Sequence, residues 1–197
     1  MYPVYLKMDG RSAIVIGAGT VAERKIQTLL DAGAKVTVVA PDATDAIKKQ
    51  VANGVVKWKQ RAFRSRDVRG AMLIITATND PTVNTRVFKL ASRRGQLVNS
   101  VDDPNHCSFY VPAIVRRAPL IVAISSSGRS PLFAKQLRRY LDRKLYPAIG
   151  SDVEALGEER DQILAGSFGL SQKERARRIS NAQEAGVKSI LERIELA

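Results

Sequence analysis

The chain has 197 residues, enough for one full hydrophobic core and a smaller appended unit. Its 32 Lys and Arg outnumber its 19 Asp and Glu, so we expect it to attract anions, among which nucleic acid, a dinucleotide and a carboxylate-rich small molecule all qualify. A single cysteine excludes an intrachain disulfide and a cysteine-built zinc site. We expect a cytoplasmic protein, since the chain has no long apolar run and no secretory pattern at its start.

The first forty residues predict a strand, a glycine turn, a helix and a second strand. Residues 12–16 and 35–40 are short apolar runs of the kind found in buried strands. Residues 22–30, between them, have helical apolar spacing. This order is that of a βαβ unit with a right-handed crossover.

The alternation of strands and helices continues to about residue 103. Further strands are expected at 55–58, 72–77 and 97–101, and further helices at 43–53 and 81–94. Such alternation is typical of a parallel, doubly wound sheet. We therefore predict an α/β, Rossmann-like domain over residues 1–112.

The pattern changes after Asp103. Two apolar runs at 109–116 and 120–125 have no helix between them, which predicts a β-hairpin. Ser130 and Pro131 then suit the N-cap and first position of a helix that runs to about residue 145. We expect a small α+β dimerisation region at 113–150 and a helical C-terminal domain at 151–197.

A homodimer is expected because the hairpin carries more apolar surface than one small sheet covers by itself. The residues that supply its two apolar faces are Phe109, Val111, Ile114, Leu120, Val122 and Ile124. The alternative is that both faces pack within one chain, against the helical tail.

The glycine turn at residues 17–22 has the spacing of a dinucleotide-binding motif. Gly17 permits the tight turn, Gly19 lets a pyrophosphate approach the backbone, and Ala22 lets helix and strand pack closely. The free N–H groups of the following helix then suit phosphate. The alternative is a tight turn without a ligand.

Asp42 comes about 20 residues after the glycines, at the end of the second strand, where an acid is expected to bind the ribose. A helix N-cap is the alternative, and one residue can do both. No Arg or Lys occurs between Val36 and Ile47 to bind a 2′-phosphate. The sequence therefore favours NAD over NADP.

Two more polar segments follow strands and should reach the same sheet edge. Thr78 lies in a small-residue loop, 76–80, which either faces a cofactor or is a simple connection. Asp102 and Asp103 supply the best general-base candidates, with a surface turn before Pro104 as the alternative. His106 and Cys107 are adjacent, so their side chains should point apart; a metal site is left undetermined.

Three segments together resemble the precorrin-2 dehydrogenase and siroheme synthase family: residues 17–25 (GAGTVAERK), 98–103 (VNSVDD) and 124–131 (ISSSGRSP). The likeness covers about residues 1–150. It implies an NAD-dependent oxidation of precorrin-2 to sirohydrochlorin by an intertwined homodimer. In some members it also implies iron insertion, which gives siroheme.

The resemblance also implies roles for single residues. Asp102 matches the family's essential aspartate, and Ser126 matches a serine near the tetrapyrrole that is phosphorylated in one branch. Cofactor contacts are implied for Thr20, Val21, Pro41 and Asp42. Ser108 departs from the acid that many members carry, so no role is assigned to it.

A carboxylate-rich tetrapyrrole needs cationic surroundings, which gives the positive charge a specific use. Arg116, Arg117 and Arg129 lie in the region expected to approach the substrate. Two other functions compete with the dehydrogenase. One is an NAD-binding regulatory module without catalysis, and the other is nucleic-acid binding, which lacks a helix-turn-helix, an aromatic array and a zinc pattern here.

Overall fold

The computed structural model describes residues 1–196, which divide into two compact units, Met1–Val111 and a second unit that begins at Pro112. Within the described residues, no helix is long and apolar enough to cross a membrane. The predicted boundary between a dimerisation region and a separate helical domain near residue 150 stays a prediction.

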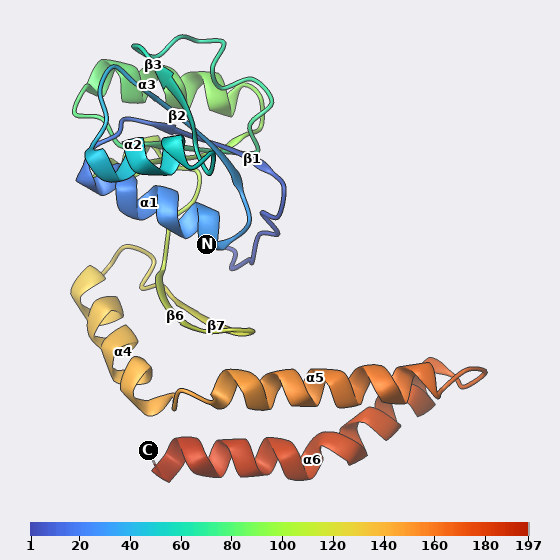
Figure 1. Ribbon diagram of the computed structural model, residues 1–197. Helices are drawn as coiled ribbons and strands as arrows, with labels where there is room; N and C mark the ends of the chain where they lie inside the picture. Colours follow the sequence, from blue (N-terminus) through green and yellow to red (C-terminus); the bar gives the residue numbers. More distant parts are fainter. Residues whose placement is uncertain (197) are drawn as a thin grey trace. The chain divides into compact units, whose positions relative to one another are not determined.

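The first unit is a five-stranded parallel sheet in the order β3-β2-β1-β4-β5 (Figure 1). Its strands are β1 (Ser12–Ile16), β2 (Lys35–Ala40), β3 (Lys57–Gln60), β4 (Leu73–Thr76) and β5 (Leu97–Ser100). Its helices are α1 (Thr20–Asp31), α2 (Asp45–Ala52), α3 (Pro81–Ser92) and the short 3-10 helix η1 (Pro104–His106). This confirms the predicted Rossmann-like α/β fold.

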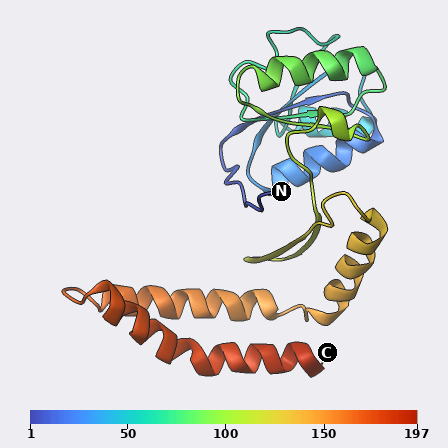
Figure 2. The same cartoon turned by 180° about the vertical axis from the view of Figure 1, so that it is seen from behind.

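Helices cover both faces of this sheet, with α1 and α2 on one face and α3 on the other (Figures 1 and 2). Strand β1 shows why, because Val15 packs with Ile26 of α1, whereas Ile14 packs with Val87 of α3. A strand buried on both faces has a continuous apolar run, which is how β1 and β2 could be found in the sequence.

The strand order places a topological switch between β1 and β4. The chain moves outward from β1 through β2 to β3, and then returns to the other side of β1 with β4 and β5. In open parallel sheets, ligands bind outside the carboxyl ends of the strands at this point. The residues that follow β1, β2, β4 and β5 therefore form the candidate site.

Strand β3 lies two residues later than predicted. Val55 is exposed and precedes the strand, while Thr37 of β2 pairs with Lys57. As an edge strand, β3 alternates Lys with other residues, so apolar pattern alone misplaced it. Trp58 fixes it to β2, because its indole N–H donates to the carbonyl of Ala40 at 3.0 Å.

The loop between β3 and β4 contains a buried ion pair. The side chain of Asp67 is fully buried, and both its oxygens accept hydrogen bonds from Arg61, at 2.6 and 2.8 Å. Lys59 and the backbone N–H of Arg64 add bonds of 3.1 and 2.8 Å. The Arg61 bonds hold the pKa of Asp67 far below its usual range, against the opposing effect of burial.

The second unit is an antiparallel hairpin with three helices. Its elements are β6 (Ala113–Arg117), β7 (Leu120–Ile124), α4 (Pro131–Lys144), α5 (Ile149–Ala165) and α6 (Gln172–Leu196). Ser130 is the N-cap of α4, as predicted, and accepts a hydrogen bond from the backbone N–H of Phe133 at 3.3 Å.

The hairpin differs from the prediction in where it begins and in how it packs. Strand β6 starts at Ala113, and Phe109 packs instead against the core of the first unit. Val115 and Val122 pair in register and pack with Leu145, Ile149 and Ile190. One apolar face is therefore covered within the chain, so the hairpin alone does not require a second copy.

Candidate functional site

The glycine turn after β1 is fixed by backbone geometry. Gly17 has a φ of +101°, and a Cβ atom at this position would lie 2.2 Å from the carbonyl oxygen of Ala77. Its own N–H donates to the carbonyl of Val39 at 3.0 Å. Only glycine fits, because the turn must pass between the ends of β2 and β4.

Gly19 has a different role from Gly17. It is the exposed N-cap of α1, and a Cβ atom added there would meet nothing within 4 Å. As a glycine it has no side chain to cap α1, whereas Asp80 caps α3 by accepting hydrogen bonds from Thr82 and Val83. The first N–H groups of α1 thus face open space, the arrangement that binds a phosphate group. Thr20 and Val21 form this first turn, and Ala22 behind them is fully buried.

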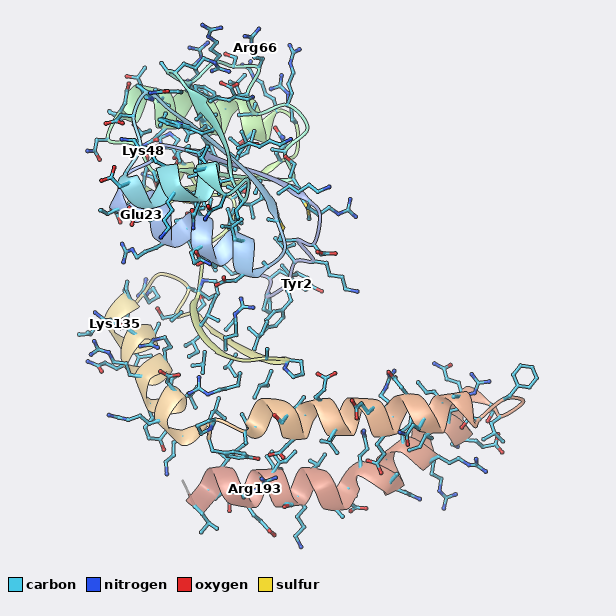
Figure 3. All side chains as sticks on the ribbon, viewed as in Figure 1. Tyr2, Glu23, Lys48, Arg66, Lys135 and Arg193 are labelled. Carbon is cyan, nitrogen blue, oxygen red and sulfur yellow. The ribbon has the colours of Figure 1, made fainter. Side chains whose placement is uncertain are left out.

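Asp42 follows β2 and is poised toward solvent. Its carboxylate accepts a 2.8 Å hydrogen bond from the N–H of Ala43, and the Nζ of Lys48 lies 3.3 Å away. Lys48 is one of the residues labelled in Figure 3. The Ala43 bond and then Lys48 lower the pKa of Asp42. Thr44 is the N-cap of α2, so Asp42 does not cap that helix.

Sequence reasoning missed Lys48. It directly follows Ile47, which ends the segment without Arg or Lys, and α2 brings it back to Asp42. The local charge at the end of β2 is therefore a paired carboxylate and ammonium, not an isolated acid.

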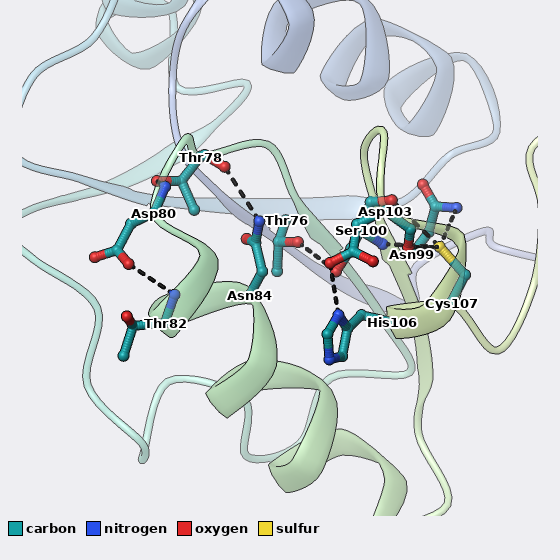
Figure 4. Close-up of polar contacts among 10 residues, drawn as sticks. All are labelled: Thr76, Thr78, Asp80, Thr82, Asn84, Asn99, Ser100, Asp103, His106 and Cys107. Carbon is teal, nitrogen blue, oxygen red and sulfur yellow. Dashed lines mark hydrogen bonds and ion pairs between the residues drawn. The ribbon is translucent and has the colours of Figure 1, made fainter.

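The ends of β4 and β5 are joined by buried hydroxyl groups. Thr76 and Ser100 are register partners, and their Oγ atoms lie 2.8 Å apart (Figure 4). In the next loop, the Oγ of Thr78 accepts from the N–H of Asp80 at 3.2 Å, and its carbonyl accepts from Nδ2 of Asn84 at 3.3 Å. Thr78 is thus held at the edge next to the glycine turn.

The structure separates the two carboxylates that follow β5. The Oδ2 of Asp103 lies 2.5 Å from Nδ1 of His106, and the imidazole packs edge-on against Phe88, with ring centroids 5.2 Å apart. Asp102 is exposed, and within residues 1–196 its carboxylate has no hydrogen bond or ion pair. Asp102 is therefore the carboxylate that is open to a substrate.

Asp102 also has an unusual backbone and a nearby cation. Its φ of +59° lies in the left-handed region, which Asp tolerates better than most residues. Burial lowers the pKa of Lys25 on α1, as does Arg24, while the charge of Asp102 opposes the change. Lys25 and Asp102 thus lie within electrostatic reach of each other.

The structure gathers most of the predicted site residues at one edge. Those that follow the strand ends of the first unit are Gly17, Gly19, Thr20, Val21, Pro41, Asp42, Thr78 and Asp102. The remaining three, Arg116, Ser126 and Arg129, belong to the second unit. In that unit Ser126 accepts a hydrogen bond from the N–H of Ser130 at 3.0 Å, and Arg116 and Arg129 are exposed.

The first-unit edge fits a bound dinucleotide. The open space at Gly19 and the uncapped start of α1 suit a pyrophosphate. The oriented carboxylate of Asp42 suits a ribose. No metal centre is evident in the part of the chain that the structure describes, because no three His, Cys, Asp or Glu side chains gather there.

Comparison with known proteins agrees with this geometry. A family described as "Putative NAD(P)-binding" matches residues 4–113. The siroheme synthase of Neisseria meningitidis serogroup C (strain 053442) is 38% identical over 174 residues, which are 88% of this chain and 36% of that protein. Siroheme synthase 3 of Aeromonas hydrophila is 36% identical over 173 residues, or 88% of this chain and 37% of that protein.

A solved structure covers the whole chain. SirC, precorrin-2 dehydrogenase, aligns with a TM-score of 0.77 and 30% sequence identity, and each chain is covered to 100%. The chain spans about a third of the length of the two siroheme synthases.

Proposed function

This chain belongs to the precorrin-2 dehydrogenase and siroheme synthase family, and we propose that it oxidises precorrin-2 to sirohydrochlorin with NAD. The observation that carries the proposal is the exposed carboxylate of Asp102, which follows β5 at the same sheet edge as the glycine turn. When bound, NAD accepts the hydride that the substrate loses.

The first unit holds the cofactor. The backbone around Gly17 and Gly19 receives the pyrophosphate, and the N–H groups of Thr20 and Val21 donate to it. Asp42 accepts hydrogen bonds from a ribose hydroxyl. Pro41 and Thr78 line the two flanks of this site, after β2 and β4.

Asp102 acts as the general base. Removing a hydride from the tetrapyrrole leaves a cation, which becomes neutral when a neighbouring C–H or N–H bond gives up its proton. A carboxylate whose oxygens have no other partner can accept that proton. Asp103 is less suited, since His106 already occupies one of its oxygens.

The second unit supplies groups for the substrate's carboxylates. Arg117 already forms an ion pair, because its guanidinium lies 3.0 Å from the carboxylate of Asp142. Arg116 and Arg129 are exposed and, within residues 1–196, have no ion pair, so they are free to bind carboxylates. Ser126 adds a hydroxyl from the loop before α4.

We also propose that the protein acts as a homodimer. One face of the hairpin is covered within the chain and needs no partner, but helix α4 leaves Leu132, Phe133 and Tyr140 exposed by 66%, 61% and 49%. Phe133 and Tyr140 are seven residues apart and lie on one face of the helix. A second copy of this face buries such a surface by symmetric pairing.

The cytoplasm is the proposed location, since a free thiol such as that of Cys107 is typical of proteins from a reducing compartment. Iron insertion, which the resemblance implies for some members, stays a prediction.

The test is to mix the purified protein with enzymatically made precorrin-2 and NAD, and to follow the absorption of the tetrapyrrole and of NADH. We expect equal amounts of sirohydrochlorin and NADH. NAD binding by calorimetry without any turnover would instead support a regulatory module.

A further inference from the structure

Cys107 lies against the turn that carries Asp102. Its Sγ accepts hydrogen bonds from the backbone N–H of Ser100 at 3.2 Å and from Nδ2 of Asn99 at 3.4 Å (Figure 4). Its thiol hydrogen is shared between the carbonyl oxygens of Ser100, at 3.2 Å, and Asp103, at 3.3 Å. One side chain thus bonds the backbone on both sides of Asp102.

The turn needs such a bond because Asp102 is held in a left-handed conformation, with a φ of +59°. Few residues with a Cβ atom adopt this conformation, although Asp tolerates it better than most. The N-terminal side of the turn is tied to β4, since Val101 donates to the carbonyl of Thr76 at 2.9 Å. The bond that closes the turn itself, from Asp103 N–H to the Ser100 carbonyl, is longer, at 3.3 Å.

We infer that Cys107 is a positioning residue for the proposed reaction: by bonding Ser100 and Asp103 it holds the Asp102 carboxylate in the place where it accepts the substrate's proton. The inference rests on the proposed function of Asp102. It gives the lone cysteine a role as a hydrogen-bond donor and acceptor rather than as a nucleophile.

The state of the thiol agrees with that role. Donation to a carbonyl requires the S–H form. Burial raises the pKa of the Cys107 thiol and the charge of Asp103 acts in the same direction, while the Ser100 N–H opposes them. A reactive cysteine has its pKa shifted in the other direction.

The experiment compares Cys107→Ala with Cys107→Ser, in which the hydroxyl can still donate and accept. Ser108→Ala is the matched control, because Ser108 bonds Val98 of β5, at 2.9 Å, and not the Asp102 turn. We expect Cys107→Ala to lower kcat about tenfold, the effect of about 1.4 kcal/mol in the barrier, with unchanged NAD affinity. Cys107→Ser should regain most of the loss, and Ser108→Ala should keep the wild-type kcat.

A double-mutant cycle separates positioning from a structural role. If Cys107 acts through Asp102, then adding Cys107→Ala to Asp102→Asn should slow turnover no further. Equal fold-losses in both backgrounds would overturn the inference, as would a wild-type kcat in Cys107→Ala.

A readout without substrate tests the hydrogen bonds of Cys107 separately from the proposed function. The Ser100 amide should exchange its hydrogen faster in Cys107→Ala than in wild type, and Cys107→Ser should restore the protection. If the wild type does not oxidise precorrin-2, the proposed function is wrong. If the Ser100 amide exchanges at the wild-type rate in Cys107→Ala, Cys107 does not hold the turn that carries Asp102.

Discussion

At the scale of single residues, the two glycines of the turn after β1 have different physical reasons to be glycine. Gly17 is required by the fold, since a Cβ atom would lie 2.2 Å from a backbone oxygen. Gly19 is not, because its Cβ would point into open space with an ordinary φ of −84°. The sequence motif cannot separate these roles, but substitution can.

Gly19→Ala should fold like wild type and bind NAD at least about tenfold more weakly, since the methyl group occupies the space for the pyrophosphate. Calorimetry measures the affinity, and the fluorescence of the single tryptophan, Trp58, measures unfolding. Gly17→Ala is the contrasting variant and should lower the unfolding midpoint. An unchanged NAD affinity in Gly19→Ala would place the pyrophosphate elsewhere.

Cofactor choice depends on the Asp42–Lys48 pair. Asp42→Ala removes the proposed ribose acceptor and frees the ammonium of Lys48, which lies 3.3 Å from the carboxylate in the wild type. We therefore expect wild type to prefer NAD, and the variant to shift the NADP-to-NAD affinity ratio toward NADP by about tenfold. Titration of both cofactors measures the ratio.

The control for this prediction is Asp42→Ala combined with Lys48→Ala, which should lose the gain in NADP binding. A ratio that does not change in Asp42→Ala would show that this carboxylate does not face the ribose.

The sequence alone does not show which of two adjacent carboxylates stays free when the turn that follows them decides it. Their position after β5 made both Asp102 and Asp103 general-base candidates, and only the family resemblance singled out Asp102. The structure distinguishes them, since η1 brings His106 onto Asp103 and leaves Asp102 open. The i, i+3 spacing of Asp103 and His106 is the signal that could have suggested this pair.

At the scale of elements, sequence prediction succeeded where burial was complete. The bounds of β1 and β2 were predicted as found, because both strands are apolar on two faces and flank a glycine turn. Edge strand β3 and the first hairpin strand β6 were displaced. Exposure dilutes the apolar pattern of β3, and Phe109 extends the pattern before β6 although it packs in another core.

The loop between β3 and β4 contains a buried ion pair that its basic composition does not predict. Residues 61–69 look like a solvated basic segment, yet Asp67 is buried and accepts bonds from Arg61. Removing one partner from a buried pair leaves an uncompensated charge. This loop is therefore an anchored part of the first unit, and its stability is linked to pH.

Asp67→Asn should lower the free energy of unfolding by about 3 kcal/mol at neutral pH. Folding lowers the pKa of Asp67. The contribution of this carboxylate to the free energy of unfolding is therefore complete above the unfolded pKa of about 4, and it is lost as the pH falls toward the native pKa. When the pH is lowered from neutral to below 4, the free energy of unfolding should therefore fall less in the variant than in the wild type. Denaturant unfolding, followed by the fluorescence of Trp58 at neutral and acid pH, measures both free energies. If the free energies of wild type and variant fell equally with pH, Asp67 would not be the source of the pH dependence.

At the scale of the whole molecule, the proposed dimer rests on helix α4. Phe133→Glu places a charge in the proposed apolar interface and should convert dimers to monomers at micromolar protein. Phe168→Glu is the matched control, because Phe168 is 99% exposed in the turn between α5 and α6. Sedimentation equilibrium reads the mass of both.

Activity completes that test. The monomeric variant should lose turnover of precorrin-2 while it retains NAD binding, since the cofactor residues lie within one unit. A wild-type protein that is monomeric and fully active would remove the dimer from the proposal.

The most direct test of the central claim is the turnover of Asp102→Asn with precorrin-2 and NAD. The amide keeps the shape of the carboxylate but cannot accept the proton, so we predict unchanged NAD affinity and a loss of about 10²- to 10⁴-fold in kcat. Turnover near that of the wild type, with NAD bound as tightly, would contradict the assignment of Asp102 as the base.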